Sequence, residues 1–205
     1  MQKSLFAEML ILNMIVLLIL LLIGTSYLPA HSSGISPVVL VYRTMQAYFE
    51  KPSKSTTTIG HLLKSKVDKP QVHPAGVFVT LSTNGKPRAC WGSVYPSHNN
   101  LTESIVYTTI GALTKDYRYK PISAHEWKNL KPQVTIIERI EPIESIQSQN
   151  PLRDGLMLRA GNKSGVILPG EASDATYQLV RCKLKAGLSA HENYQLYRFK
   201  ADIYE

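Results

Sequence analysis

The sequence predicts an α+β fold built on a largely antiparallel sheet with flanking helices. Short runs rich in β-branched and aromatic residues recur between residues 76 and 203, as expected for strands. Two turn signals, Asn84-Gly85 and the segment 160–162, join neighbouring runs directly and favour hairpins. Helical patterns are placed irregularly among these strands. The chain therefore lacks the repeating strand–helix–strand units of a parallel sheet.

The first expected helix covers residues 37–51. Proline at position 37 is harmless there, because the first N–H of a helix has no partner within the helix. Apolar residues then recur at helical spacing: Val38, Val41, Met45, Tyr48 and Phe49. Pro52 is expected to end this helix, and residues 53–58 to form a polar loop.

A hairpin is expected next, with residues 76–82 and 89–94 as its strands, so that Cys90 lies on the partner of a core strand. A second helix is expected from Thr102 to Asp116, with Thr102 as its N-cap. The remaining elements follow in chain order: a helical turn at 124–129, a strand at 133–140, hairpin strands at 155–159 and 163–168, a helix at 172–185 ended by Gly187, and a closing strand at 194–203.

The N-terminal region has a different character from the rest of the chain. Residues 9–28 are uncharged and rich in leucine and isoleucine. Twenty helical residues rising 1.5 Å each reach roughly 30 Å, the thickness of a bilayer core. We therefore expect residues 1–28 to form a single-pass membrane anchor, residues 29–36 a linker, and residues 37–205 the folded domain.

The charges around this span favour one orientation. Lys3 precedes the span and no charge follows it until Arg43, which predicts a cytoplasmic N-terminus. A cleaved secretory signal is the alternative, with the cut after Ala30 and a secreted domain as its product. The sequence Leu-Pro-Ala before that cut is a poor cleavage site, and the apolar stretch is long for a signal peptide.

The composition is basic, with 23 Lys+Arg against 15 Asp+Glu and a formal net charge of +8. This balance favours anionic partners. Nucleic-acid binding is nevertheless not expected, since the basic residues form no long run and no nucleic-acid motif occurs. The histidines have no metal-binding spacing, so the sequence identifies no metal or cofactor. Cys90 and Cys182 can form one disulfide in an oxidising compartment.

Cys90 is the first candidate catalytic residue. Arg88 lies two positions before it, on the same face of an extended strand, where its charge would favour the reactive thiolate. A nucleophile also needs a base, for which His73, His98 and His125 are candidates. The alternative is that Cys90 is a buried small hydrophobe, as most free cysteines are.

Other residues are candidates for binding. Asp116 and Arg118 can face each other in a turn, where they either position a ligand or tie a helix end to a strand. Arg159 and Lys163 lie in a glycine-bearing segment that can bind an anion, although a plain hairpin explains the glycines as well. Trp91 can stack on a ring or serve as a core residue.

Several of these segments resemble the AMMECR1 domain family. The family's signature, Leu-Arg-Gly-Cys-Ile-Gly, is similar to Pro87-Arg88-Ala89-Cys90-Trp91-Gly92, which keeps the arginine, the cysteine and the final glycine. Residues 116–119 resemble its Asp-x-Arg-aromatic segment, and residues 155–169 its glycine-rich stretch. The resemblance runs from about Val38 to the C-terminus. Ala89 and Trp91 depart from the signature, which puts an inherited active site in doubt.

The resemblance implies an α+β domain with two subdomains. Family members often occur beside or fused to Memo-like proteins and radical S-adenosylmethionine proteins, and enzymatic, regulatory and nucleic-acid roles have been suggested for them. We therefore expect a membrane-anchored AMMECR1-type domain. It is either an enzyme that depends on Cys90 or a non-enzymatic binding or scaffold module, with a nucleic-acid-binding regulatory domain as a further alternative.

Overall fold

A computed structural model describes residues 34–50, 52–69, 74–189 and 191–205, and its strands form one antiparallel sheet in the order β2-β1-β3-β6-β4-β5. The strands are β1 (Val77–Thr83), β2 (Lys86–Ser93), β3 (Lys131–Ile143), β4 (Gly155–Ala160), β5 (Lys163–Ile167) and β6 (Gln195–Tyr204). The helices are α2 (Pro37–Phe49), α3 (Pro52–Leu62), α4 (Leu101–Thr114), the 3-10 turn η1 (Trp127–Asn129) and α5 (Ala175–Ala186). The predicted α+β fold is confirmed.

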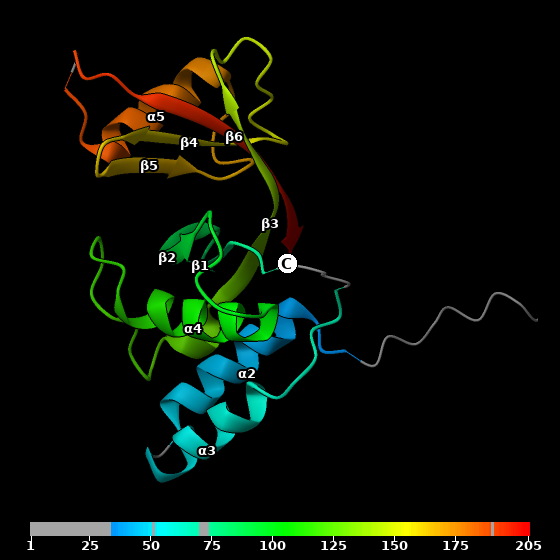
Figure 1. Cartoon of the computed structure of the whole chain (residues 1–205). Helices are drawn as coiled ribbons and strands as arrows, with labels where there is room; N and C mark the ends of the chain where they lie inside the picture. Colours follow the sequence, from blue (N-terminus) through cyan, green and yellow to red (C-terminus); the bar gives the residue numbers. More distant parts are fainter. Residues whose placement is uncertain (1–33, 51, 70–73, 190) are drawn as a thin grey trace, which may run out of the picture. The chain divides into compact units, whose positions relative to one another are not determined.

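Two long strands, β3 and β6, run through both halves of the sheet (Figure 1). The first part of β3 pairs with β1, and the first part of β6 pairs with β4. Helices α2 and α4 pack on the half that contains β1, and α5 packs on β4 and β5. Each half of the sheet is thus covered by helices of its own, within the single unit Gly34–Glu205.

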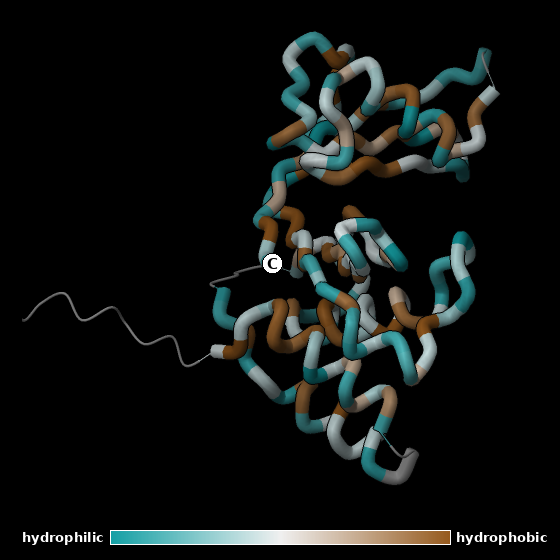
Figure 2. Tube along the Cα trace, turned by 180° about the vertical axis from the view of Figure 1, so that it is seen from behind, coloured by the Kyte–Doolittle hydropathy of each residue, from teal (hydrophilic) through white to brown (hydrophobic). Residues whose placement is uncertain are grey.

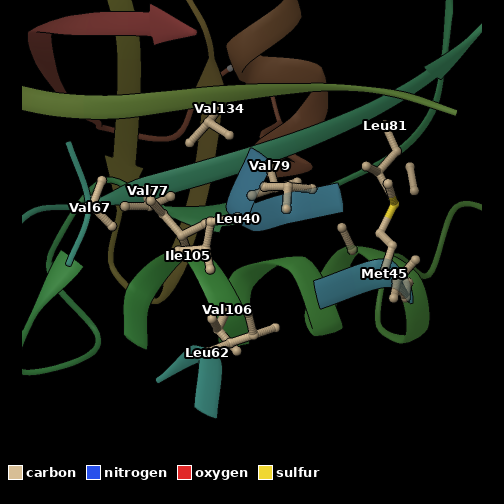
Figure 3. Close-up of a cluster of buried hydrophobic side chains, with 14 of the residues drawn as sticks. Leu40, Met45, Leu62, Val67, Val77, Val79, Leu81, Ile105, Val106 and Val134 are labelled. Atoms are coloured by element: carbon tan, nitrogen blue, oxygen red, sulfur yellow. The ribbon is translucent and has the colours of Figure 1, made fainter. Parts of the chain in front are cut away.

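The faces of β1 separate two hydrophobic clusters. Val77, Val79 and Leu81 point toward α2 and α4 and belong to the larger cluster (Figure 3). Phe78 lies on the other face and joins a second cluster that contains Phe199 of β6. Along the trace, hydrophobic and hydrophilic positions are interleaved, as expected when each element buries one face (Figure 2).

One predicted loop is a helix. Residues 53–58 belong to α3, which begins at Pro52. The preceding helix does end before this proline, at Phe49, and its C-cap Glu50 is extended. The proline itself is tolerated at the first position of the new helix. Leu62 and Ile59 pack α3 against the core, a tertiary contact that the polar sequence of the segment does not reveal.

The starts of two helices differ from the prediction. The N-cap of α4 is Asn100, whose side chain accepts a hydrogen bond from the Glu103 amide at 2.9 Å. The predicted cap, Thr102, lies inside the helix. Helix α5 begins three residues later than predicted, after its N-cap Asp174. Gly187 ends α5 in the left-handed region with φ of 62°, as predicted.

The predicted anchor, residues 1–28, lies outside the described residues. In the part of the chain that the structure does describe, no helix is both long and apolar enough to cross a bilayer. The end of the predicted linker belongs to the fold, because Ile35 forms a β-bridge with Val67.

Candidate functional site

A cleft of about 410 Å³ lies where the β1–β2 hairpin and the turn after α4 face β5 and α5. Phe78 and Cys90 line it from the hairpin, and Arg181 and Lys185 line it from α5. A second hollow of about 380 Å³ shares Phe78 with the cleft and continues toward β4. The two hollows also share Gly92, Ser164 and Val166, and we call them together the groove.

The Cys90 thiol faces this groove and is partly buried beside the Phe78 cluster. Cys90 pairs with Thr80 of β1, and the Thr80 hydroxyl donates a hydrogen bond to its sulfur at 3.4 Å. Burial raises the pKa of the Cys90 thiol above its ordinary value, and this hydrogen bond offsets the effect only in part. Among the described residues, no histidine lines the groove, and His73 lies outside them. Burial therefore favours the protonated thiol over the thiolate.

The backbone of Cys90 is fixed by Asp116. Strand β2 lies at the edge of the sheet, so its outward N–H groups need partners. The Cys90 amide donates to Asp116 Oδ2 at 2.8 Å. Arg118 donates to the same carboxylate through Nε at 2.8 Å and Nη2 at 2.7 Å. Burial alone would raise the pKa of Asp116, but these hydrogen bonds outweigh it and lower the pKa.

The Arg88 guanidinium is paired with Glu126, whereas the sequence predicts that it favours the Cys90 thiolate. A bulge in the β1–β2 pairing leaves Arg88 without a partner on β1, and bulges re-aim side chains. Its guanidinium donates to both carboxylate oxygens of Glu126, at 3.0 and 3.2 Å, and to the Lys120 carbonyl at 3.0 Å. This pairing does not favour a role of Arg88 in lowering the pKa of Cys90, which stays a prediction. Arg88 instead holds the loop 116–126.

An aromatic ring joins the two arginines. The Tyr119 ring lies 5.8 Å from the Arg88 guanidinium and 5.5 Å from that of Arg118. The signature segment and the Asp-x-Arg-aromatic segment therefore form one network of ion pairs, hydrogen bonds and cation–π contacts. This network fixes the rim of the cleft on the β2 side.

Two glycines let Trp91 and β2 pack closely. A Cβ atom on Gly92 would lie 2.3 Å from the Val77 carbonyl oxygen, so only glycine permits this approach of β2 to β1. A Cβ atom on Gly111 of α4 would lie 2.1 Å from Cδ1 of Trp91. The indole thus sits against α4, and it lines the cleft while remaining 36% exposed.

Sequence reasoning missed the two cations of α5, Arg181 and Lys185. Their i, i+4 spacing places them on one helical face, in a helix that contains no acidic residue. This pair of cations on one face of a predicted helix is the sequence feature that could have identified them. Arg181 lies 5.7 Å from the Tyr177 ring and forms no ion pair within the described residues. The Lys185 ammonium donates to the Val166 carbonyl at 2.8 Å.

The predicted binding residues of the β4–β5 hairpin lie in the second hollow, not in the cleft. Arg159 and Lys163 both line that hollow. Lys163 is already paired with Glu192 at 2.7 Å, so its charge is largely compensated. The structure therefore separates these two residues from Cys90 and Arg118.

Both cysteines are free thiols in the structure. Cys182 is buried, its sulfhydryl donates to the Leu156 carbonyl at 3.2 Å, and burial raises its pKa to about 12. The disulfide that the sequence allows is therefore not formed here. Within the described ranges, no group of three or more metal-ligating side chains is placed to hold an ion.

Comparisons with known proteins agree with these motifs. The AMMECR1 family profile matches residues 38–204. A protein of Thermotoga maritima is 34% identical over 135 residues, which cover 64% of this chain and 78% of that protein. A protein of Methanocella arvoryzae is 32% identical over 160 residues, covering 71% and 81%. The crystal structure of an uncharacterized protein from Pyrococcus horikoshii is similar, with a TM-score of 0.63 and 27% identity over 82% of this chain and 88% of that one.

Proposed function

The chain belongs to the AMMECR1 family, and we propose that its domain binds a small anionic molecule in the cleft beside Cys90. One observation carries this proposal. Three cations line the cleft: Arg118 is paired with Asp116 and Lys185 lies 3.4 Å from Glu171, whereas Arg181 forms no ion pair within the described residues. A concave site with an excess of fixed cations favours an anion.

Aromatic side chains add an apolar contact to this site. Phe78, Trp91 and Tyr117 line the same cleft as the cations. Rings of this kind stack on planar groups, and the arginines supply hydrogen bonds to phosphate or carboxylate oxygens. The ligand that fits both features carries an anionic group and a flat apolar part.

Titration calorimetry with inorganic phosphate, pyrophosphate and a nucleoside monophosphate tests the proposal. We expect Arg181→Gln to weaken binding about tenfold, the effect of losing one charge-assisted hydrogen bond. Arg43→Gln is the matched control, because Arg43 is exposed on α2 and does not line the groove. Failure of all three anions to bind, or equal affinity of Arg181→Gln and the native protein, would refute the proposal.

Cysteine-dependent chemistry remains a second prediction, because the Cys90 thiol lines the same cleft. No histidine base lies among the described residues that line the groove. The Cys90 amide is already bonded to Asp116, so it is not a free donor for an oxyanion. A ligand or partner would have to supply the base. Cys90→Ser separates the two functions, since it abolishes the chemistry and leaves anion binding intact.

We further propose that residues 1–28 anchor the domain in a membrane with a cytoplasmic N-terminus, and that it works with a Memo-like or radical S-adenosylmethionine partner. A protein of Clostridium acetobutylicum that matches 60% of this chain is longer, since the match covers 27% of it, so the domain occurs there together with additional sequence. Membrane fractionation with a protease-protection assay tests the anchor and its orientation. Release of a shortened chain into the medium would favour the secreted alternative.

A further inference from the structure

Helix α5 carries an apolar stripe on its exposed face. Its buried face consists of Gln178, Cys182 and Ala186, which pack toward the sheet. The stripe is formed by Tyr177, Val180 and Leu184, whose exposed fractions are 47%, 46% and 75%. Their i, i+3, i+7 spacing puts them on one side of the helix, opposite the buried residues.

Basic residues flank this stripe on both sides. At about 100° per residue, Lys183 falls on one flank, and Arg181 and Lys185 fall on the other. Helix α5 contains no aspartate or glutamate. The nearby acids are Asp174, which caps the helix N-terminus, and Glu171, which lies 3.4 Å from Lys185. The exposed face of α5 is therefore apolar along its centre and cationic at its edges.

We propose that this face of α5 lies on an anionic lipid surface. Apolar side chains of such a helix enter the boundary between headgroups and acyl chains, while flanking cations meet lipid phosphates. The cations that flank the stripe complement the negative charge of such a lipid surface. A second copy of the chain would bring Lys183 and Arg181 of both copies together across a two-fold axis, which like-charge repulsion opposes.

The predicted anchor allows a stripe of only three apolar residues to hold α5 on the lipid surface. Three apolar residues give weak affinity on their own, but a domain tethered at residues 9–28 meets the bilayer at a high local concentration. Tyr177, Val180 and Leu184 do not line the cleft, whereas Arg181 and Lys185 do, so the apolar stripe is separate from the anion site but shares these two cations with it.

Hydroxyl-radical footprinting of the full chain tests this contact. The protein is reconstituted into discs of phosphatidylcholine alone or of phosphatidylcholine mixed with phosphatidylglycerol. We expect oxidation of Tyr177 and Leu184 to fall several-fold only in the anionic discs, and to recover at high salt. Tyr42 and Tyr107 serve as internal references, because they are similarly exposed on other helices.

Charge reversal supplies the matched variants. Lys183→Glu should restore oxidation of Leu184 in anionic discs, whereas Lys54→Glu on α3 should not. Equal oxidation in both kinds of disc would overturn the proposal. Protection of the stripe in detergent without lipid would also overturn it, because another protein segment or a second copy would then cover α5.

Discussion

At the scale of single residues, the signature segment builds the rim of the cleft. Arg88 holds the loop 116–126 through Glu126, and the Cys90 amide holds Asp116. Gly92 permits the close approach of β2 to β1. Each matched residue of the signature thus has a structural role that does not require thiolate chemistry.

The reactivity of Cys90 follows from this geometry. We expect its thiol to titrate above the ordinary cysteine value of about 8.5 in both the native protein and Arg88→Gln, because burial raises its pKa and Arg88 points elsewhere. The pH profile of Cys90 alkylation by iodoacetamide, read by mass spectrometry, measures this. Cys182, which is fully buried, should stay unmodified while the protein is folded and so reports any unfolding during the reaction. A Cys90 midpoint below pH 8, or a clear shift in Arg88→Gln, would contradict the assignment.

The Asp116 carboxylate should stabilise the fold in a pH-dependent way. Its folded-state pKa is lowered, so its contribution is complete above the unfolded pKa of about 3.9 and disappears as pH falls through the folded value. We expect Asp116→Asn to lower the free energy of unfolding by about 2 kcal/mol at pH 7, and this deficit to shrink below pH 4. Urea unfolding across pH measures it. Glu144→Gln, at an exposed loop position, should show no such deficit.

At the scale of elements, the contact between β2 and α4 can be tested by a double-mutant cycle. Alanine at an interior helix position is normally more stable than glycine by about 0.5–1 kcal/mol. Gly111→Ala should instead destabilise the native protein, because its Cβ would lie 2.1 Å from the Trp91 ring. In a Trp91→Val background, where the indole is absent, Gly111→Ala should instead stabilise the protein. Thermal unfolding of the native protein, the two single variants and the double variant measures these changes in stability. An equal effect of Gly111→Ala in both backgrounds would rule out the contact.

Most helices and strands could be predicted from the sequence, because turn and cap residues that mark their ends lie within or next to them. The Asn84-Gly85 turn has φ values of 50° and 71°, as a tight hairpin turn requires, and Gly187 takes the left-handed conformation that ends α5. The site was harder to predict, because its geometry depends on tertiary structure. The alternation of side chains along β2 places Arg88 beside Cys90, and only the bulge in the β1–β2 pairing turns it toward Glu126.

At the scale of the whole molecule, the two halves of the sheet are continuous through β3 and β6. Residues 195–199 of β6 pair with β4, while residues 200–204 continue along β3. Lys200 of β6 forms an ion pair with the buried Asp154, which precedes β4. Because each half depends on strands that also belong to the other, we expect neither half to unfold alone.

The positions of the tryptophans make this cooperativity measurable. Trp91 and Trp127 both lie in the half formed by β1, β2 and α4, so tryptophan fluorescence reports mainly on that half. Leu158→Ala removes a fully buried side chain from the other half and should cost about 2–5 kcal/mol. If the halves unfold together, Leu158→Ala lowers the urea midpoint by the same amount whether unfolding is followed by tryptophan fluorescence or by far-UV circular dichroism. Leu184→Ala, at an exposed position of the same half, should leave both midpoints in place. An unchanged fluorescence midpoint in Leu158→Ala would mean that the two halves are separate folding units.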